Sequence, residues 1–314
     1  MKHKALIGTL AGAGIVAAAL ALALGPLAPA AAAAKTDGMA THNMGIKGAA
    51  KNIKAATAPL TYGGGPVETT PSVYIVYWGS QWVSGFSTGG YTSAQAQTYM
   101  QDFFGNVGGS SWNNIDAQYC QGVAVGTINC GSSGTHITNS VGQLKGVWTD
   151  GSNLPKRITQ SGIASEAAKA VSHFGFDPNA TYMVFTPSGH SMSGFKTQWC
   201  AWHSSTSSGG NTIAYGYIPY IPDAAGNCGM NFVNSTNNSY GNGYFDGFSI
   251  VGGHEYAEAQ TDPHPSSGWV DSSGAENGDK CAWSSLSTNI TLGSHFYAVQ
   301  PIWSNATGGC ATAA

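Results

Sequence analysis

Apolar residues gather into short runs, separated by glycine-rich and polar stretches, and each run predicts one element. Four buried strands are predicted from β-branched and aromatic runs, at 71–78, 181–187, 211–220 and 296–303. Three helices are predicted from helical spacing and capping residues, at 92–104, 161–174 and 247–261. Residues 111–150 predict short strands and loops. Helices and strands mix without a strict βαβ order, so we expect an α+β fold with a mixed sheet and packed helices.

The first 34 residues follow a different pattern. A basic start, MKHK, precedes a long uncharged apolar run and then a series of small residues, APAAAAA. This order predicts a cleaved secretory signal peptide, and hence an extracellular protein that leaves the membrane after cleavage. The apolar run is also long enough to span a bilayer, so an uncleaved anchor is the alternative.

Two further regions follow the signal. Residues 35–61 carry four lysines and one aspartate with little apolar pattern, which predicts a flexible or pro-like segment. Residues 62–314 contain no repeat and no evident linker, which predicts a single globular domain.

The chain contains an even number of cysteines, all of them after the signal: Cys120, Cys130, Cys200, Cys228, Cys281 and Cys310. In an exported protein this number predicts three disulfides. Six cysteines allow about 15 pairings. We favour the sequential one, Cys120–Cys130, Cys200–Cys228 and Cys281–Cys310. No C-x-x-C occurs, which argues against a thiolate zinc site or a thioredoxin-like motif.

Charge is distributed unevenly. Residues 62–314 hold fourteen acidic residues and six basic ones, so a nucleic-acid partner is excluded, because such a partner requires a basic face. Six of the acids fall between 255 and 279, and no lysine or arginine occurs from 197 to 279. Carboxylates gathered without cations repel one another, so they must face solvent or share a bound cation.

The acidic region contains His254-Glu255-Tyr256-Ala257-Glu258. In a helix, His254 and Glu258 share one face, so both could bind the same metal ion. The pattern resembles the zincin motif H-E-x-x-H, with Glu258 in place of the second histidine. We therefore expect a zinc site in a zincin-like fold, with Glu255 as the general base and a peptide or protein as the substrate.

A catalytic zinc needs a third protein ligand. Glu276 and Asp279 are the first candidates, because they follow the helix by a plausible loop that a disulfide at Cys281 would hold. Alternative ligands are found elsewhere in the chain, namely Asp262, His203 and His264.

Two other motifs carry less weight. Gly189-His190-Ser191-Met192-Ser193 nearly matches the nucleophile elbow, but the last position is not glycine and no helix is predicted to follow. The segment from Asp271 to Asp279 could hold calcium through oxygen ligands, yet it departs from the EF-hand pattern because Ala282 stands at the twelfth position. Calcium is therefore a weaker expectation than zinc. The sequence does not specify an oligomeric state.

Several pieces together resemble the EXORDIUM, or phosphate-induced, family of secreted plant proteins and their bacterial relatives. They are VYIVYWGSQW, the segment Trp199–Ser204, the tyrosine-rich run before Cys228, SIVGGHEYAEAQTDP, and Glu276-Asn-Gly-Asp279-Lys-Cys281. They lie in order across residues 62–305. Where the family pattern has Thr-Asn-Pro after the helix, this chain has Asp262, which favours Glu276 or Asp279 as the ligand, while His203 stays a candidate.

The resemblance implies an exported, disulfide-containing protein with an extracellular role in growth and no established reaction. It therefore also supports a second hypothesis, a non-catalytic extracellular binding or signalling protein with a structural metal or none.

Overall fold

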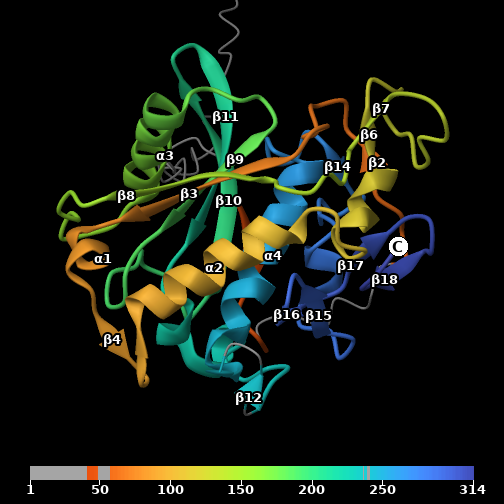
Figure 1. Cartoon of the computed structure of the whole chain (residues 1–314). Helices are drawn as coiled ribbons and strands as arrows, with labels where there is room; N and C mark the ends of the chain where they lie inside the picture. The colour runs from red at the N-terminus through yellow and green to blue at the C-terminus, as the bar shows by residue number, and fades with distance from the viewer. Residues whose placement is uncertain (1–40, 49–56, 236, 239–240) are drawn as a thin grey trace, which may run out of the picture. The chain divides into compact units, whose positions relative to one another are not determined.

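Six strands form the central mixed sheet of the computed structural model, in the order β1-β10-β11-β9-β3-β8 (Figure 1). The structure describes residues 41–48, 57–235, 237–238 and 241–314. The strand bounds are β1 Thr41–Gly45, β3 Ser72–Trp78, β8 Leu144–Asp150, β9 Ala180–Phe185, β10 Trp199–Ser208 and β11 Asn211–Ile218. Strands β8, β3, β9 and β11 run parallel, whereas β10 and β1 are added antiparallel at one edge.

Helices cover both faces of this sheet. They are α2 Ser93–Val107, α3 Gln160–Phe174 and α4 Asp246–Thr261, and a short helix, α1, spans Ser80–Ser84. On one face, Tyr74 of β3 packs on Phe174 of α3. On the other, the hydroxyl of Tyr77 donates to the carbonyl of Gln97 in α2. Because side chains alternate along a strand, α3 and α2 cover opposite faces, and α4 packs beside α2 (Figure 1).

Small hairpins and turns complete the fold. The two-stranded pieces are β2 Thr61–Tyr62 with β14 Trp269–Val270, β4 Ser87–Thr88 with β5 Tyr91–Thr92, β6 Cys120–Gln121 with β7 Thr135–His136, β12 Asn237–Asn238 with β13 Gly241–Asn242, β15 Thr288–Leu292 with β16 His295–Val299, and β17 Ile302–Ser304 with β18 Gly309–Ala311. Short 3-10 helices span Asn113–Gln118, Ile221–Cys228, Gly243–Phe245 and Asp279–Cys281.

The α+β class and the mixed sheet are confirmed, and so is the sequential disulfide pairing of Cys120–Cys130, Cys200–Cys228 and Cys281–Cys310. All three predicted helices form. Helix α2 begins with a capping box, in which the hydroxyl of Thr92 accepts from the amide of Gln95.

Three local differences separate the prediction from the structure. Strand β10 was not expected. The single strand predicted at 296–303 is two strands, because Pro301 cannot donate to a ladder and interrupts it. Residues 41–45 of the segment predicted as flexible form β1, which is paired with β10. The signal peptide prediction, and residues 35–40 and 49–56 of the segment predicted as flexible, lie outside the described residues.

No helix in the described part of the chain is long and apolar enough to cross a membrane. Those residues belong to one compact unit, 37–314.

Candidate metal centre

Helix α4 carries the H-E-x-x-E motif through the interior of the protein. Nε2 of His254 lies 3.0 Å from Oε1 of Glu258, one helical turn away. Every residue of α4 is buried. Aromatic side chains can approach the helix closely because Gly253 has no side chain, and a Cβ there would lie 3.2 Å from Cζ of Phe103. The motif therefore lies in the core and not on a solvated face.

The loop 276–279 rests directly on this helix. A Cβ on Gly278 would lie 2.8 Å from Nδ1 of His254 and 2.9 Å from Oε1 of Glu258, so only glycine allows the approach. The amide of Asp279 donates to Oε1 of Glu258 at 2.9 Å. The loop thus presents the carboxylate of Asp279 beside the motif.

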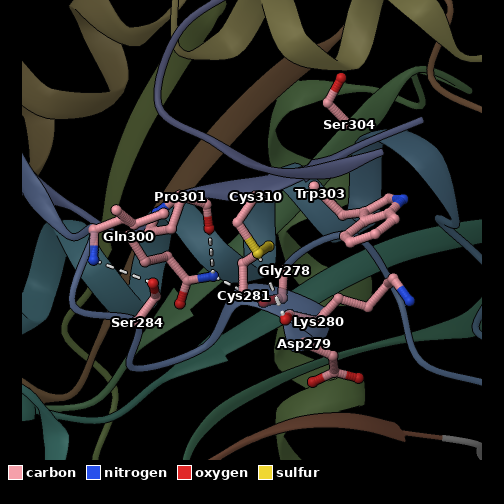
Figure 2. The surroundings of a disulfide bond; sticks show 12 residues. Gly278, Asp279, Lys280, Cys281, Ser284, Gln300, Pro301, Trp303, Ser304 and Cys310 are labelled. Atoms are coloured by element: carbon pink, nitrogen blue, oxygen red, sulfur yellow. Dashed lines mark hydrogen bonds between the residues drawn. A yellow bond between two sulfur atoms is a disulfide. The ribbon is translucent and has the colours of Figure 1, made fainter. Parts of the chain in front are cut away.

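Covalent and ionic contacts hold the loop from behind. The Cys281–Cys310 disulfide ties it to β18, and the ammonium of Lys280 binds Asp271 at 2.8 Å. Figure 2 shows the side chains of Asp279 and Lys280 pointing in different directions next to this disulfide. The ammonium of Lys280 therefore points at Asp271 and away from the side chain of Asp279.

Two histidines reach α4 from the antiparallel edge of the sheet. His203 of β10 and His42 of β1 are direct partners in the strand register, with ring centroids 5.9 Å apart. Nδ1 of His203 lies 3.3 Å from Oε2 of Glu255. Nδ1 of His42 lies 3.0 Å from Oε2 of Glu276 and 3.4 Å from Oδ2 of Asp279. Register pairing therefore places both imidazoles over the motif.

These groups form a closed ring in which imidazoles and carboxylates alternate. Going round, the ring comprises His254, Glu258, His203, Glu276, His42 and Asp279. Neighbouring nitrogen and oxygen atoms are between 3.0 and 3.8 Å apart. Ligand atoms held tetrahedrally at zinc distances are about 3.3–3.6 Å apart, so the ring already has the spacing of a coordination shell.

The tautomer of His254 is set by a neighbouring amide. Nε2 of Gln300 donates to the carbonyl of Gly278 at 2.9 Å, which leaves its Oε1 to accept from Nδ1 of His254 at 3.2 Å. When the ring of His254 loses its second proton, the lone pair is therefore on Nε2 and directed at the ring, which is the arrangement that second-shell partners impose on metal-binding histidines.

His203 is placed differently. Its Nδ1 faces Glu255, and its Nε2 lies 3.3 Å from the carbonyl oxygen of Asp262. Both ring nitrogens thus face oxygen acceptors, so His203 is best satisfied as a doubly protonated imidazolium that positions Glu255 and Glu258.

Several ring atoms make close ionic contacts or none, and lack a partner in hydrogen-bond geometry among the described residues. They are Nε2 of His254, Oε2 of Glu258 and both carboxylate oxygens of Glu276. These three side chains are fully buried, whereas Asp279 and His42 keep 22% and 16% exposure. Buried polar groups are normally satisfied, and unsatisfied ones lining one space indicate a ligand that provides the missing contacts. The donor set of imidazole and carboxylate fits zinc or a similar divalent cation.

Burial and neighbouring charges shift the pKa values of the side chains in the ring. Burial would lower the pKa of His254, but the charge of Glu258 outweighs it and raises that pKa to about 9. For His203 the hydrogen bond to Glu255 likewise overcomes burial, and its pKa rises to about 10. Burial would raise the pKa of Glu258, yet the neighbouring histidines hold it well below its usual value. Burial and the charge of Glu258 raise the pKa of Glu276.

Most of the predicted site residues therefore converge. His254, Glu255, Glu258, Glu276, Asp279 and His203 all lie in or against the ring. Asp262 does not act as a ligand here, because its carboxylate accepts from the backbone amides of Ser266, Ser267 and Gly268. The groups of clustered donors among the described residues do not include His264.

The structure bears on both of the other motifs. After β9, the segment 189–193 runs into turns and no helix follows, so the nucleophile elbow is absent from this described stretch. The carboxylate of Asp271 is engaged by Ser273, Ala275 and Lys280, all protein donors, which leaves little capacity for calcium.

His42 was not predicted as a site residue. The only signal lay in Thr41-His-Asn-Met-Gly-Ile46, where a histidine and two apolar residues are spaced two apart within a lysine-rich segment. This spacing is the alternation of a half-buried strand, but it is too short to be distinctive.

Comparison of the chain with protein-family models, with curated proteins and with solved structures yields no match. The chemistry of the centre must therefore be argued from its own residues.

Proposed function

We propose that this protein is an exported, zinc-dependent hydrolase of the metallopeptidase type. The observation that carries the proposal is the convergence of Nε2 of His254, Oε1 of Glu258 and Oδ1 of Asp279, whose ligand atoms lie within 4.8 Å of one another. A set of three protein ligands is what a catalytic zinc requires. Bound zinc would acidify a water molecule and polarise a carbonyl group.

Glu255 is the proposed general base. Its Oε2 faces Nδ1 of His203 at 3.3 Å, and its Oε1 accepts from the amide of Met44 at 3.4 Å. Burial raises the pKa of Glu255 although His203 opposes the shift, and a raised pKa suits a carboxylate that must accept and return a proton near neutral pH. In this proposal His203 is a positioning residue that fixes the orientation of the base.

Export and substrate class belong to the same proposal. Three disulfides are expected of a protein that folds outside the cytoplasm. A peptide bond is the substrate expected for a zincin-like H-E-x-x-E helix. We also propose the relationship to EXORDIUM proteins on the basis of the sequence segments that resemble them.

The test is a comparison of Glu255→Gln with the wild type. Zinc content is measured by elemental analysis, and cleavage of a diverse peptide mixture is followed by mass spectrometry. The variant should keep its zinc and lose about 100-fold or more in cleavage rate. Glu166→Gln, which changes a buried carboxylate in α3 paired with Lys169, is the matched control and should cleave as the wild type does. Undiminished cleavage by Glu255→Gln would disprove the assignment.

One observation favours a second candidate, a structural metal in a non-catalytic extracellular binding protein. His203, His254, Glu255, Glu258 and Glu276 are fully buried, and only His42 and Asp279 reach the surface. Three cavities of about 170, 290 and 240 Å³ are lined by residues outside the ring, so none of these three would bring a substrate to the metal. This candidate predicts that chelation lowers the melting temperature and that no peptide in the mixture is cleaved.

A further inference from the structure

The ring contains more ligand atoms than a four-coordinate zinc ion can use. A zinc ion bound by His254, Glu258 and Asp279 leaves His42 and Glu276 on the opposite side of the ring. Those two form another group of converging donors together with Glu258. A single mononuclear site therefore does not account for the whole cluster.

The carboxylates of Asp279 and Glu258 are each shared between the donors around His254 and those around His42. Oδ1 of Asp279 faces Nε2 of His254 at 3.8 Å, and Oδ2 of the same carboxylate faces Nδ1 of His42 at 3.4 Å. Glu258 belongs to both groups of converging donors, and its Oε1 lies 3.0 Å from Nε2 of His254 while its Oε2 lies 3.5 Å from Nδ1 of His203. A carboxylate whose two oxygens point at different histidines has the geometry of a bridge between two metal ions.

Glu276 provides an independent indication of the second ion. Its side chain is fully buried and neither of its oxygens has a hydrogen-bond partner in the described part of the chain. Its Oε2 lies 3.0 Å from Nδ1 of His42 and 3.6 Å from Nε2 of His203. These imidazoles are close to Glu276 but do not meet hydrogen-bond geometry, so the buried carboxylate is costly unless a cation provides the missing contacts.

We propose that the ring binds two divalent cations, one at His254 and the other at His42 and Glu276, with Glu258 and Asp279 bridging them. The inference rests on the proposed metal site, but it does not require that site to be hydrolytic. Carboxylate-bridged pairs typically hold their ions about 3.5–4 Å apart and stabilise both the attacking and the leaving oxygen of a displacement. β1 thereby becomes part of the centre and not merely an edge strand.

The test is the metal content of the full chain after chelation and reconstitution with zinc alone, followed by removal of excess ion. We expect two zinc ions per chain in the wild type and one in His42→Ala. His190→Ala changes a histidine whose ring contacts Gln81 and Ser188 outside the ring, so it is the control and should keep two. Saturation of the folded wild type at one ion would overturn the proposal.

A second variant and a second readout allow for the chance that His42→Ala fails to fold. Glu276→Gln keeps the size of the side chain and should also reduce the content to one. Reconstitution with manganese should give an exchange-coupled paramagnetic resonance spectrum in the wild type and an uncoupled six-line spectrum in Glu276→Gln. A six-line spectrum in the wild type at saturation would contradict a bridged pair.

The outcomes for the two proposals are separable. Two ions without peptide cleavage would uphold the pair and reject the hydrolase, whereas one ion with cleavage that depends on Glu255 would do the reverse.

Discussion

Nδ1 of His254 lies 3.2 Å from Oε1 of Gln300. This contact joins the connection between β16 and β17 to the centre of α4. Because Nε2 of Gln300 is used by the carbonyls of Gly278 and Pro301, its Oε1 can only accept from His254. One amide therefore orients the imidazole and holds the loop that carries Asp279.

Replacing Gln300 should weaken metal binding without removing a ligand. Gln300→Met keeps a long unbranched side chain but cannot accept from Nδ1, so His254 loses its fixed tautomer. We expect zinc affinity to fall by about 10- to 100-fold, as for other second-shell changes. Competition with a chromogenic chelator measures the effect. An unchanged affinity would show that the contact does not orient the imidazole.

Adding one methyl group to Gly278 should displace the ligand loop. The new Cβ of Gly278→Ala would lie under 3 Å from both His254 and Glu258, so the backbone must move away from α4. We expect a loss of about 1–3 kcal/mol in the free energy of unfolding, typical of overpacking, and weaker zinc binding. Gly309→Ala is the control, because its Cβ would meet nothing within 4 Å. Equal behaviour of the two variants in denaturant unfolding and zinc titration would refute the close approach.

The stability of the metal-free protein should fall as pH rises from about 6.5 to about 9. The pKa of His254 is raised to about 9 in the fold, because the charge of Glu258 overcomes burial. A group with a raised folded-state pKa stabilises the fold fully below its unfolded pKa, and this contribution is lost as pH passes the folded pKa. Melting temperatures measured in chelator should show the decline.

Zinc binding should depend on pH in the opposite direction to the stability of the metal-free protein. Zinc needs the lone pair on Nε2, so its binding at pH 7 should release protons, and its affinity should rise toward pH 9. Calorimetry in buffers of different ionisation enthalpy counts the protons. Binding at pH 7 without proton release would contradict the prediction that zinc displaces a proton from His254.

Acid should weaken the support of the ligand loop at Asp271. Burial would raise its pKa, but the hydrogen bonds from Lys280 and Ser273 lower it to about 2. A lowered folded-state pKa gives stability that is present above the unfolded pKa and lost as pH falls through the folded one. We expect Asp271→Asn to cost about 3 kcal/mol at pH 7, because Lys280 loses its buried partner.

Denaturant unfolding of both proteins across the acid range checks this expectation. The difference between wild type and Asp271→Asn should shrink between about pH 4 and pH 2. A difference that stays constant with pH would mean that the ion pair contributes nothing to the fold.

Local patterns were sufficient where one element determines its own structure. Strands β3 and β9 were predicted because both faces are buried and their residues form continuous apolar runs. Helix α4 was predicted from its motif and its ending before Pro263. The proximity of Glu276 and Asp279 to the helix followed from a short connection near a cysteine.

Pairing over long distances could not be predicted in this way. The second half of β10 is rich in serine and threonine, so no apolar run revealed it, and its strand conformation depends on β11. β1 has only five residues and depends in turn on β10. His42 was missed for that reason, since its role arises from register and not from local sequence.

Under the proposed export, the position of His42 would give the site of N-terminal cleavage a chemical meaning. Cleavage of a signal peptide near residue 34 would leave β1 attached, whereas removal of the whole segment up to residue 61 would take away the strand, its histidine and the amide of Met44 that contacts Glu255. The site of proteolytic maturation would then decide the ligand count of the centre. Two forms of one gene product, differing only at the N-terminus, would differ in metal stoichiometry and in the exposure of Glu255 and Glu276 to solvent.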